Sequence, residues 1–109
     1  MKRLLVVLAA CGGAQHAPPA ADPVKQEIER AEDAERARQH EQAAVHYRAA
    51  IAAAHTPKQQ AWAHHEFAET LATWGQLADA THELDAAATA TPDDASIWQD
   101  LGILRHKQA

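Results

Sequence analysis

Apolar residues recur at helical spacing through most of the chain beyond residue 22, and no segment shows the alternation of a β-strand. This pattern predicts an all-α fold of five helices. We expect four helices over residues 23–38, 41–54, 57–75 and 76–90, and a fifth that follows residues 91–94 and runs to about residue 107. The expected inward faces carry, in chain order, Val24, Ile28, Ala31, Ala34, Ala43, Ala44, Tyr47, Ala50, Ile51, Ala54, Phe67, Ala68, Leu71, Trp74, Leu77, Ala80, Leu84, Ala87, Ala88, Ile97, Trp98, Leu101 and Leu104.

Three prolines divide this pattern at regular intervals. Asp22-Pro23, Thr56-Pro57 and Thr91-Pro92 each place a capping side chain before a residue that suits the first helical turn. The prolines are 34 and then 35 residues apart. A fixed period in this range is typical of stacked helical repeats, which form extended binding surfaces.

Residues 61–102 carry the most regular part of the pattern. Large and small side chains alternate along two successive helices and into the next unit, at Phe67, Ala68, Leu71, Ala80, Leu84, Ala87, Trp98, Leu101 and Gly102. This arrangement resembles the tetratricopeptide repeat (TPR), a family built from 34-residue helix pairs. The resemblance implies a TPR-like domain over residues 22–109, with about two repeats of antiparallel helices and a C-terminal capping helix. The upstream unit departs from the family, because Glu27 and Arg30 stand where large apolar residues are expected.

The resemblance also implies which side chains pack where. Small residues should lie at close helix crossings, at Ala68, Ala80, Ala87 and Gly102. Larger side chains should fill the spaces between the helices, at Tyr47, Phe67, Leu71, Leu84 and Trp98. We therefore expect Phe67, Leu84 and Trp98 to meet in one interior.

A groove is the second implication of the resemblance, because TPR arrays usually bind peptides or helices on the face formed by the first helix of each pair. The positions implied in this chain are Trp62, His65, Glu69, Thr73, Ser96, Gln99, Ile103 and His106. Trp62 is the foremost candidate, since it falls outside the core positions and tryptophan is enriched at binding hot spots. The alternative is that Trp62 packs against a neighbouring helix as part of the core.

The N-terminus has the features of a secretory signal. Lys2 and Arg3 precede seven apolar residues and then Cys11. Leu8-Ala9-Ala10-Cys11 resembles the lipobox of bacterial lipoproteins, which implies a signal peptide over residues 1–10, a lipidated Cys11, and a flexible tether through residue 21. Such a protein would be anchored in the cell envelope and face the periplasm, with the outer membrane favoured because Gly12 is not aspartate. The alternatives are an ordinary signal peptide with a chance cysteine, and a cytosolic protein whose start is misassigned.

Charge and cysteine content narrow the function. The formal charge is −5, and loss of Lys2 and Arg3 with a signal peptide would make it −7. An acidic domain is a poor match for phosphate backbones, so we expect no nucleic-acid partner. The single cysteine excludes an intrachain disulfide framework. No nucleophile elbow or phosphate-binding glycine loop is present, so we expect a protein that is not an enzyme, holds no cofactor, and positions another envelope protein.

Two other functions stay open. The chain has eight histidines, and His65 and Glu69 are four residues apart, so both could face one side of a helix and bind a metal. Solvated histidines without a specific metal are the competing interpretation. A structural subunit of a larger assembly is the other candidate, because about three repeats are normally needed for stability and self-association could complete the array.

Overall fold

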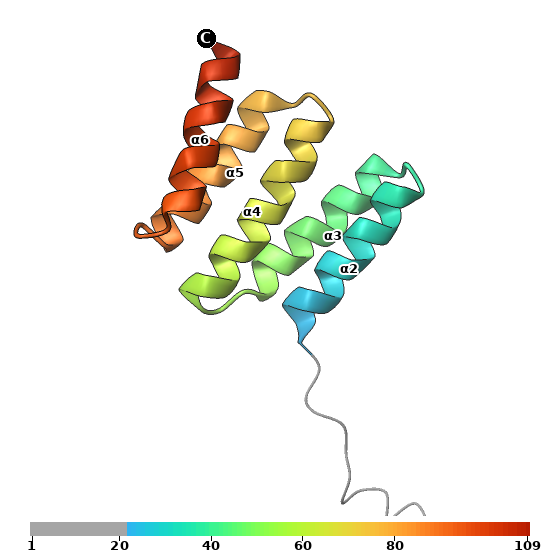
Figure 1. Ribbon diagram of the computed structural model, residues 1–109. Helices are drawn as coiled ribbons and strands as arrows, with labels where there is room; N and C mark the ends of the chain where they lie inside the picture. Colours follow the sequence, from blue (N-terminus) through green and yellow to red (C-terminus); the bar gives the residue numbers. More distant parts are fainter. Residues whose placement is uncertain (1–21) are drawn as a thin grey trace, which may run out of the picture.

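The computed structural model describes residues 22–109, which form five α-helices and no strand (Figure 1). The helices are α2 (Pro23–Arg36), α3 (His40–Ala53), α4 (Pro57–Thr73), α5 (Leu77–Ala90) and α6 (Ala95–Gln108). The predicted all-α class with five helices is therefore confirmed. The expected signal peptide of residues 1–10, the expected lipidation at Cys11 and the expected tether through residue 21 lie outside the described residues.

Two of the three predicted helix starts have the expected caps. The side chain of Asp22 accepts a hydrogen bond of 3.2 Å from the backbone N–H of Lys25. Thr56 and Gln59 form a reciprocal capping box at the start of α4, so two backbone donors at that end are satisfied. The fifth helix follows residues 91–94 as expected, but Pro92 lies in a turn rather than in the first helical turn, and Asp94 rather than Thr91 caps α6 at Ala95.

The ends of α2 and α4 share one backbone motif. The N–H of Gly75 bonds to the carbonyl of Ala72, and that of Gln76 to Leu71, as in a Schellman turn. Gly75 takes the left-handed φ of +83° that this turn requires. The same turn closes α2, where Arg38 takes a φ of 61° although it is not glycine.

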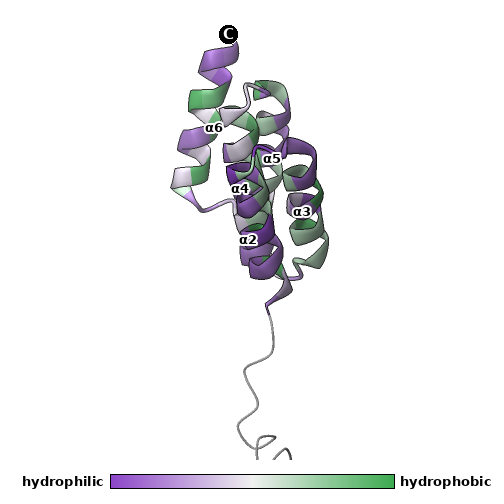
Figure 2. Cartoon of the chain, turned by 90° about the vertical axis from the view of Figure 1, so that its right-hand side faces the viewer, coloured by the Kyte–Doolittle hydropathy of each residue, from purple (hydrophilic) through white to green (hydrophobic). Residues whose placement is uncertain are grey.

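The helices form two antiparallel pairs, α2 with α3 and α4 with α5, and α6 packs on α5. In the turned view, α2, α4 and α6 lie toward one side and α3 and α5 toward the other (Figure 2). We call the first side the α2–α4–α6 face. It brings together helices that are separated in sequence.

The second helix pair repeats the first with an offset of 37 residues. The spacing of 34 residues between Pro23 and Pro57 is therefore shorter than the structural repeat. Adding 37 to the bounds of α3 gives those of α5, and adding 37 to the end of α2 gives the end of α4. The first two prolines are closer because α4 has 17 residues and α2 has 14. From α4 to α6 the offset is 34, since buried Phe67 corresponds to buried Leu101.

The core is made of alanines with a few large side chains. Ala80 and Ala87 are fully buried and Ala68 nearly so, which matches their predicted positions at close contacts. The rings of Tyr47 and Phe67 stack at 5.2 Å between centroids and join the two helix pairs. Small side chains let the helices approach, and the aromatic pair fills the space between them.

Two packing predictions at α6 are wrong. Phe67 and Leu84 belong to the core, but Trp98 is 48% exposed and does not meet them inside. A Cβ at Gly102 would have no neighbour within 4 Å, so this glycine is not at a close helix crossing. Both residues lie on a face of α6 against which no other described helix packs, and the Trp98 indole instead donates to the carbonyl of Pro92.

The helices can also be compared in length and apolar character with a membrane-spanning segment. Within residues 22–109, none combines the length and the apolar character needed to cross a lipid bilayer.

Candidate functional site

The predicted groove residues gather in two hollows between α4 and α6. One hollow, of about 280 Å³, is lined by Trp62 and His65 of α4 and Ser96 of α6, with Ile97 behind them. Trp62 is 39% exposed, so it is not part of the core. This end of the surface offers an aromatic ring beside an imidazole.

The second hollow lies further along the same two helices. Glu69 and Thr73 of α4 and Ile103 of α6 line a space of about 270 Å³. Its floor includes Leu84 of α5, and Asp100 stands at its edge with Ile103. Six of the eight predicted groove residues therefore line these two hollows.

Gln99 and His106 are the exceptions. Both are exposed on α6, and neither lines a hollow.

His65 connects the two hollows. Its Nε2 lies 2.9 Å from Oδ2 of Asp100 on α6, and its Nδ1 lies 3.9 Å from Oε1 of Glu69. Because an aspartate accepts, the imidazole donates its Nε2–H to Asp100. This bond sets the ring's orientation on the α2–α4–α6 face.

A third hollow on this face was not predicted from the sequence. It measures about 340 Å³ between α2 and α4, and its lining includes Glu32, Glu35, Glu66 and Glu69. Together with Asp100, these four carboxylates form a surface over three helices that we call the acidic face. A sequence signal for it exists, since Glu32 and Glu69 are 37 residues apart and so occupy equivalent positions in the two helix pairs.

The acidic face rests on a buried hydroxyl pair. Tyr47 of α3 donates a hydrogen bond of 3.0 Å to Oε1 of Glu35, and the hydroxyls of Tyr47 and Thr70 lie 2.9 Å apart. Thr70 also contacts the Glu35 carboxylate. Burial, and then the negative charge of Glu35, raise the pKa of the Tyr47 hydroxyl well above its ordinary value. This network fixes the Glu35 side chain between the two helix pairs.

Glu66 is the carboxylate of the acidic face whose pKa responds most clearly to burial and to the neighbouring negative charges. Burial, and then the neighbouring carboxylate of Glu69, raise the pKa of Glu66 above its ordinary 4.5. Glu32 adds to this effect from α2. A cationic group arriving at this surface would relieve the repulsion.

Within residues 22–109, no lysine or arginine nitrogen lies within 4.0 Å of a carboxylate of the acidic face. The arginine ion pairs of this segment join Arg30 to Glu27, Arg36 to Asp33 and Arg105 to Asp85, and none of these acids belongs to the acidic face. The imidazole of His65 is the one basic group within 4.0 Å of its carboxylates in this part of the chain. The surface is therefore a concentrated patch of negative charge.

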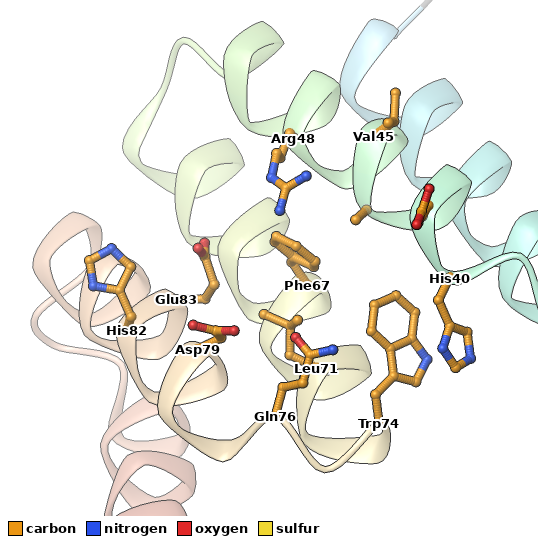
Figure 3. Close-up of a pocket in the computed structure, with 12 residues that line it drawn as sticks. His40, Val45, Arg48, Phe67, Leu71, Trp74, Gln76, Asp79, His82 and Glu83 are labelled. Carbon is orange, nitrogen blue, oxygen red and sulfur yellow. The ribbon is translucent and has the colours of Figure 1, made fainter.

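A larger hollow opens on the opposite side, between α3 and α5 (Figure 3). It measures about 540 Å³, and Phe67 and Leu71 of α4 lie at its centre. Trp74 at its edge stacks on His40, with 4.2 Å between the ring centroids. Its lining includes Arg48 as well as acids such as Asp79, so its charges are mixed, and its aromatic rings already pack within the protein. We therefore take the acidic face as the candidate site and treat this hollow as the competing one.

A metal could be held at one group of residues in the described segment. His65, Glu66 and Glu69 each offer a ligand atom, and these atoms lie within 4.8 Å of one another. His65 and Glu69 were predicted from their spacing, whereas Glu66 was not. His64, next in sequence, points away toward Glu83 on α5.

Comparisons with protein-family models, curated proteins and solved structures find no match to this chain.

Proposed function

We propose that this domain binds a basic segment of another protein on its acidic face and performs no chemistry of its own. Five carboxylates from α2, α4 and α6 without a lysine or arginine partner are the observation that carries this proposal. Opposite charges on a partner steer association and give specificity. Lysine and arginine side chains match such a surface, whereas nucleic acid would be repelled.

Exposed apolar groups beside the acidic face supply the anchoring contacts. Trp62 and Ile103 are 39% and 48% exposed, and they lie in the two hollows between α4 and α6. Buried aromatic and aliphatic anchors dominate binding energy, while charges around them select the partner. The preferred ligand is therefore an extended or helical segment that alternates basic and apolar side chains.

The repeated helix pairs support a TPR-type interpretation of this surface. The offset of 34 residues from α4 to α6 equals the family's unit, although the offset of 37 between the pairs is longer. We extend the proposal to the whole chain as a lipoprotein, anchored through Cys11 and facing the periplasm. The sequence Leu8-Ala9-Ala10-Cys11 supports that part.

A selection from a random peptide library tests the binding proposal without assuming a partner. The enriched peptides should carry net positive charge. Their affinity should fall at least tenfold for the Glu32→Gln/Glu69→Gln double variant. The matched control, Glu41→Gln/Asp79→Asn, removes two exposed carboxylates beside the opposite hollow and should bind like the unaltered chain. Enrichment of neutral or acidic peptides, or equal losses in both variants, would refute the proposal.

Anchoring is tested separately by growing bacteria that express the chain with an alkyne-labelled fatty acid. The unaltered chain should incorporate the label and fractionate with membranes. Cys11→Ser should abolish both. An unlabelled wild-type chain would exclude the lipoprotein part and leave the binding part untouched.

A further inference from the structure

The centre of the α2–α4–α6 face holds a nitrogen ligand among carboxylates. His65, Glu66 and Glu69 lie at positions i, i+1 and i+4 of α4, and their ligand atoms are within 4.8 Å of one another. The His65 side chain is 23% exposed and that of Glu69 is 61% exposed, so an ion from solvent can reach both. Three side chains of metal-binding type therefore converge on one point of the surface.

A fourth residue orients the nitrogen ligand from a different helix. The Nε2–H of His65 donates to Oδ2 of Asp100 over 2.9 Å. That bond leaves the lone pair on Nδ1, the nitrogen 3.9 Å from Oε1 of Glu69. Metal-binding histidines commonly donate their other ring N–H to a carboxylate in this way, which fixes the tautomer and strengthens the ligand.

We propose that His65, Glu66 and Glu69 bind one divalent transition-metal ion, with Zn²⁺ the best match, and that Asp100 positions His65 for this role. An imidazole with carboxylates suits zinc, copper or nickel, whereas Mg²⁺ and Ca²⁺ prefer oxygen ligands alone. Three protein ligands would leave the fourth position of a tetrahedral zinc ion to water or to a partner's side chain.

The geometry needs only a small adjustment. Zinc lies about 2.0–2.2 Å from nitrogen and oxygen ligands, so two ligand atoms on one ion are at most about 4 Å apart. Nδ1 of His65 and Oε1 of Glu69 are already 3.9 Å apart, and the widest separation within the group, at most 4.8 Å, needs to shorten by less than 1 Å. Glu66 stands in a repulsive environment that a cation would relieve.

The other inter-helix histidines are arranged differently. His46 meets Glu27, and His64 meets Glu83, each through Nδ1 at 2.7 Å. In both cases one carboxylate faces one ring, and no third ligand of the described residues joins them. His65 differs from these two histidines because each of its ring nitrogens faces a carboxylate.

Calorimetric titration of the full chain with ZnCl₂ tests the proposal. We expect one saturable site that His65→Gln and Glu69→Gln each weaken at least tenfold. Asp100→Asn should weaken it about tenfold, as loss of a positioning partner does. The control His82→Gln alters an exposed histidine beside the opposite hollow and should leave the affinity within twofold.

Histidine ¹⁵N spectra add a readout that a merely structural role would not move. Zinc should shift Nδ1 of His65 while its Nε2 stays protonated. Circular dichroism checks that each variant remains helical, and the exposed Glu69 provides a variant that does not disturb the core. The proposal is overturned by absence of a saturable site, by zinc binding that survives both His65→Gln and Glu69→Gln, or by preference for Mg²⁺ or Ca²⁺ over Zn²⁺.

Discussion

The imidazole of His64 in α4 lies 2.7 Å, from Nδ1 to Oε1, from the carboxylate of Glu83 in α5. The first helix pair holds the same bridge with the partners exchanged, because Glu27 of α2 meets His46 of α3 at the same distance. Each position in one bridge is 37 residues from its counterpart in the other. The same inter-helix bridge therefore links both helix pairs, with the histidine on the second helix in one pair and on the first helix in the other.

Exchanging the residues of the second bridge should preserve it. His64→Glu alone would place two carboxylates together, and Glu83→His alone would pair two imidazoles. We expect each single variant to lose about 1 kcal/mol of unfolding free energy at pH 7, since a part-buried polar group loses its partner. The double variant should recover most of the loss in urea unfolding. A double variant that is as unstable as the sum of the two singles would show that the bridge contributes nothing.

The turn after α2 predicts a stabilising substitution. Arg38 adopts a left-handed φ of 61° in the position that Gly75 fills after α4. A non-glycine residue pays about 1–2 kcal/mol for this conformation. Arg38→Gly should therefore raise the unfolding free energy by about 1 kcal/mol, and Gly75→Arg should lower it by a similar amount. Thermal melts that move in the same direction for both variants would contradict this comparison.

Glu66 predicts an unusual pH dependence. Its pKa is higher in the folded chain than the ordinary 4.5, so folding favours its protonated form. Its favourable contribution is complete below pH 4.5 and is lost as the pH rises through the folded pKa. Glu66→Gln should therefore be more stable than wild type at pH 7, with the difference closing below about pH 4.5. Glu29→Gln, at the equivalent exposed position of α2, is the matched control, and a gain at pH 7 as large as that of Glu66→Gln would contradict the assignment to Glu66.

Alanine substitutions at Trp62 and Phe67 should distinguish a role in ligand binding from a role in folding. Phe67 is 3% exposed within the core, so Phe67→Ala should lower the free energy of unfolding by about 3–5 kcal/mol. Trp62 is 39% exposed, and Trp62→Ala should change the thermal melt little while weakening capture of a basic peptide at least tenfold. A large loss of stability in Trp62→Ala would instead assign the indole to the core.

Local sequence signals predicted the helices and three of their caps well, because capping and helical periodicity depend on neighbours within a few residues. Asp22, Thr56 and Gly75 act as their positions indicated. Pro92 misled because the turn that precedes α6 also accommodates proline, and Asp94 supplies the actual cap. Whether Trp98 is buried depends on whether another helix packs on its side of α6, and the local sequence pattern does not predict that.

The acidic face could not be read from the local pattern for a related reason. Glu32 and Glu35 looked like members of an ordinary solvated helix surface, and only tertiary packing places them beside Glu66 and Glu69. The period of 34 residues taken from the prolines obscured the match, since the helix pairs repeat at 37. With the correct offset, Glu32 and Glu69 coincide.

The most direct test maps where a basic peptide binds. The ¹⁵N-labelled chain is titrated with a lysine- and arginine-containing peptide from the selection, and backbone shifts are followed residue by residue. The account predicts shifts concentrated on α2, α4 and α6 around Glu32, Glu66 and Glu69, which weaken as salt is added. Shifts confined to α3 and α5 around the hollow with Arg48 and Trp74 would contradict it.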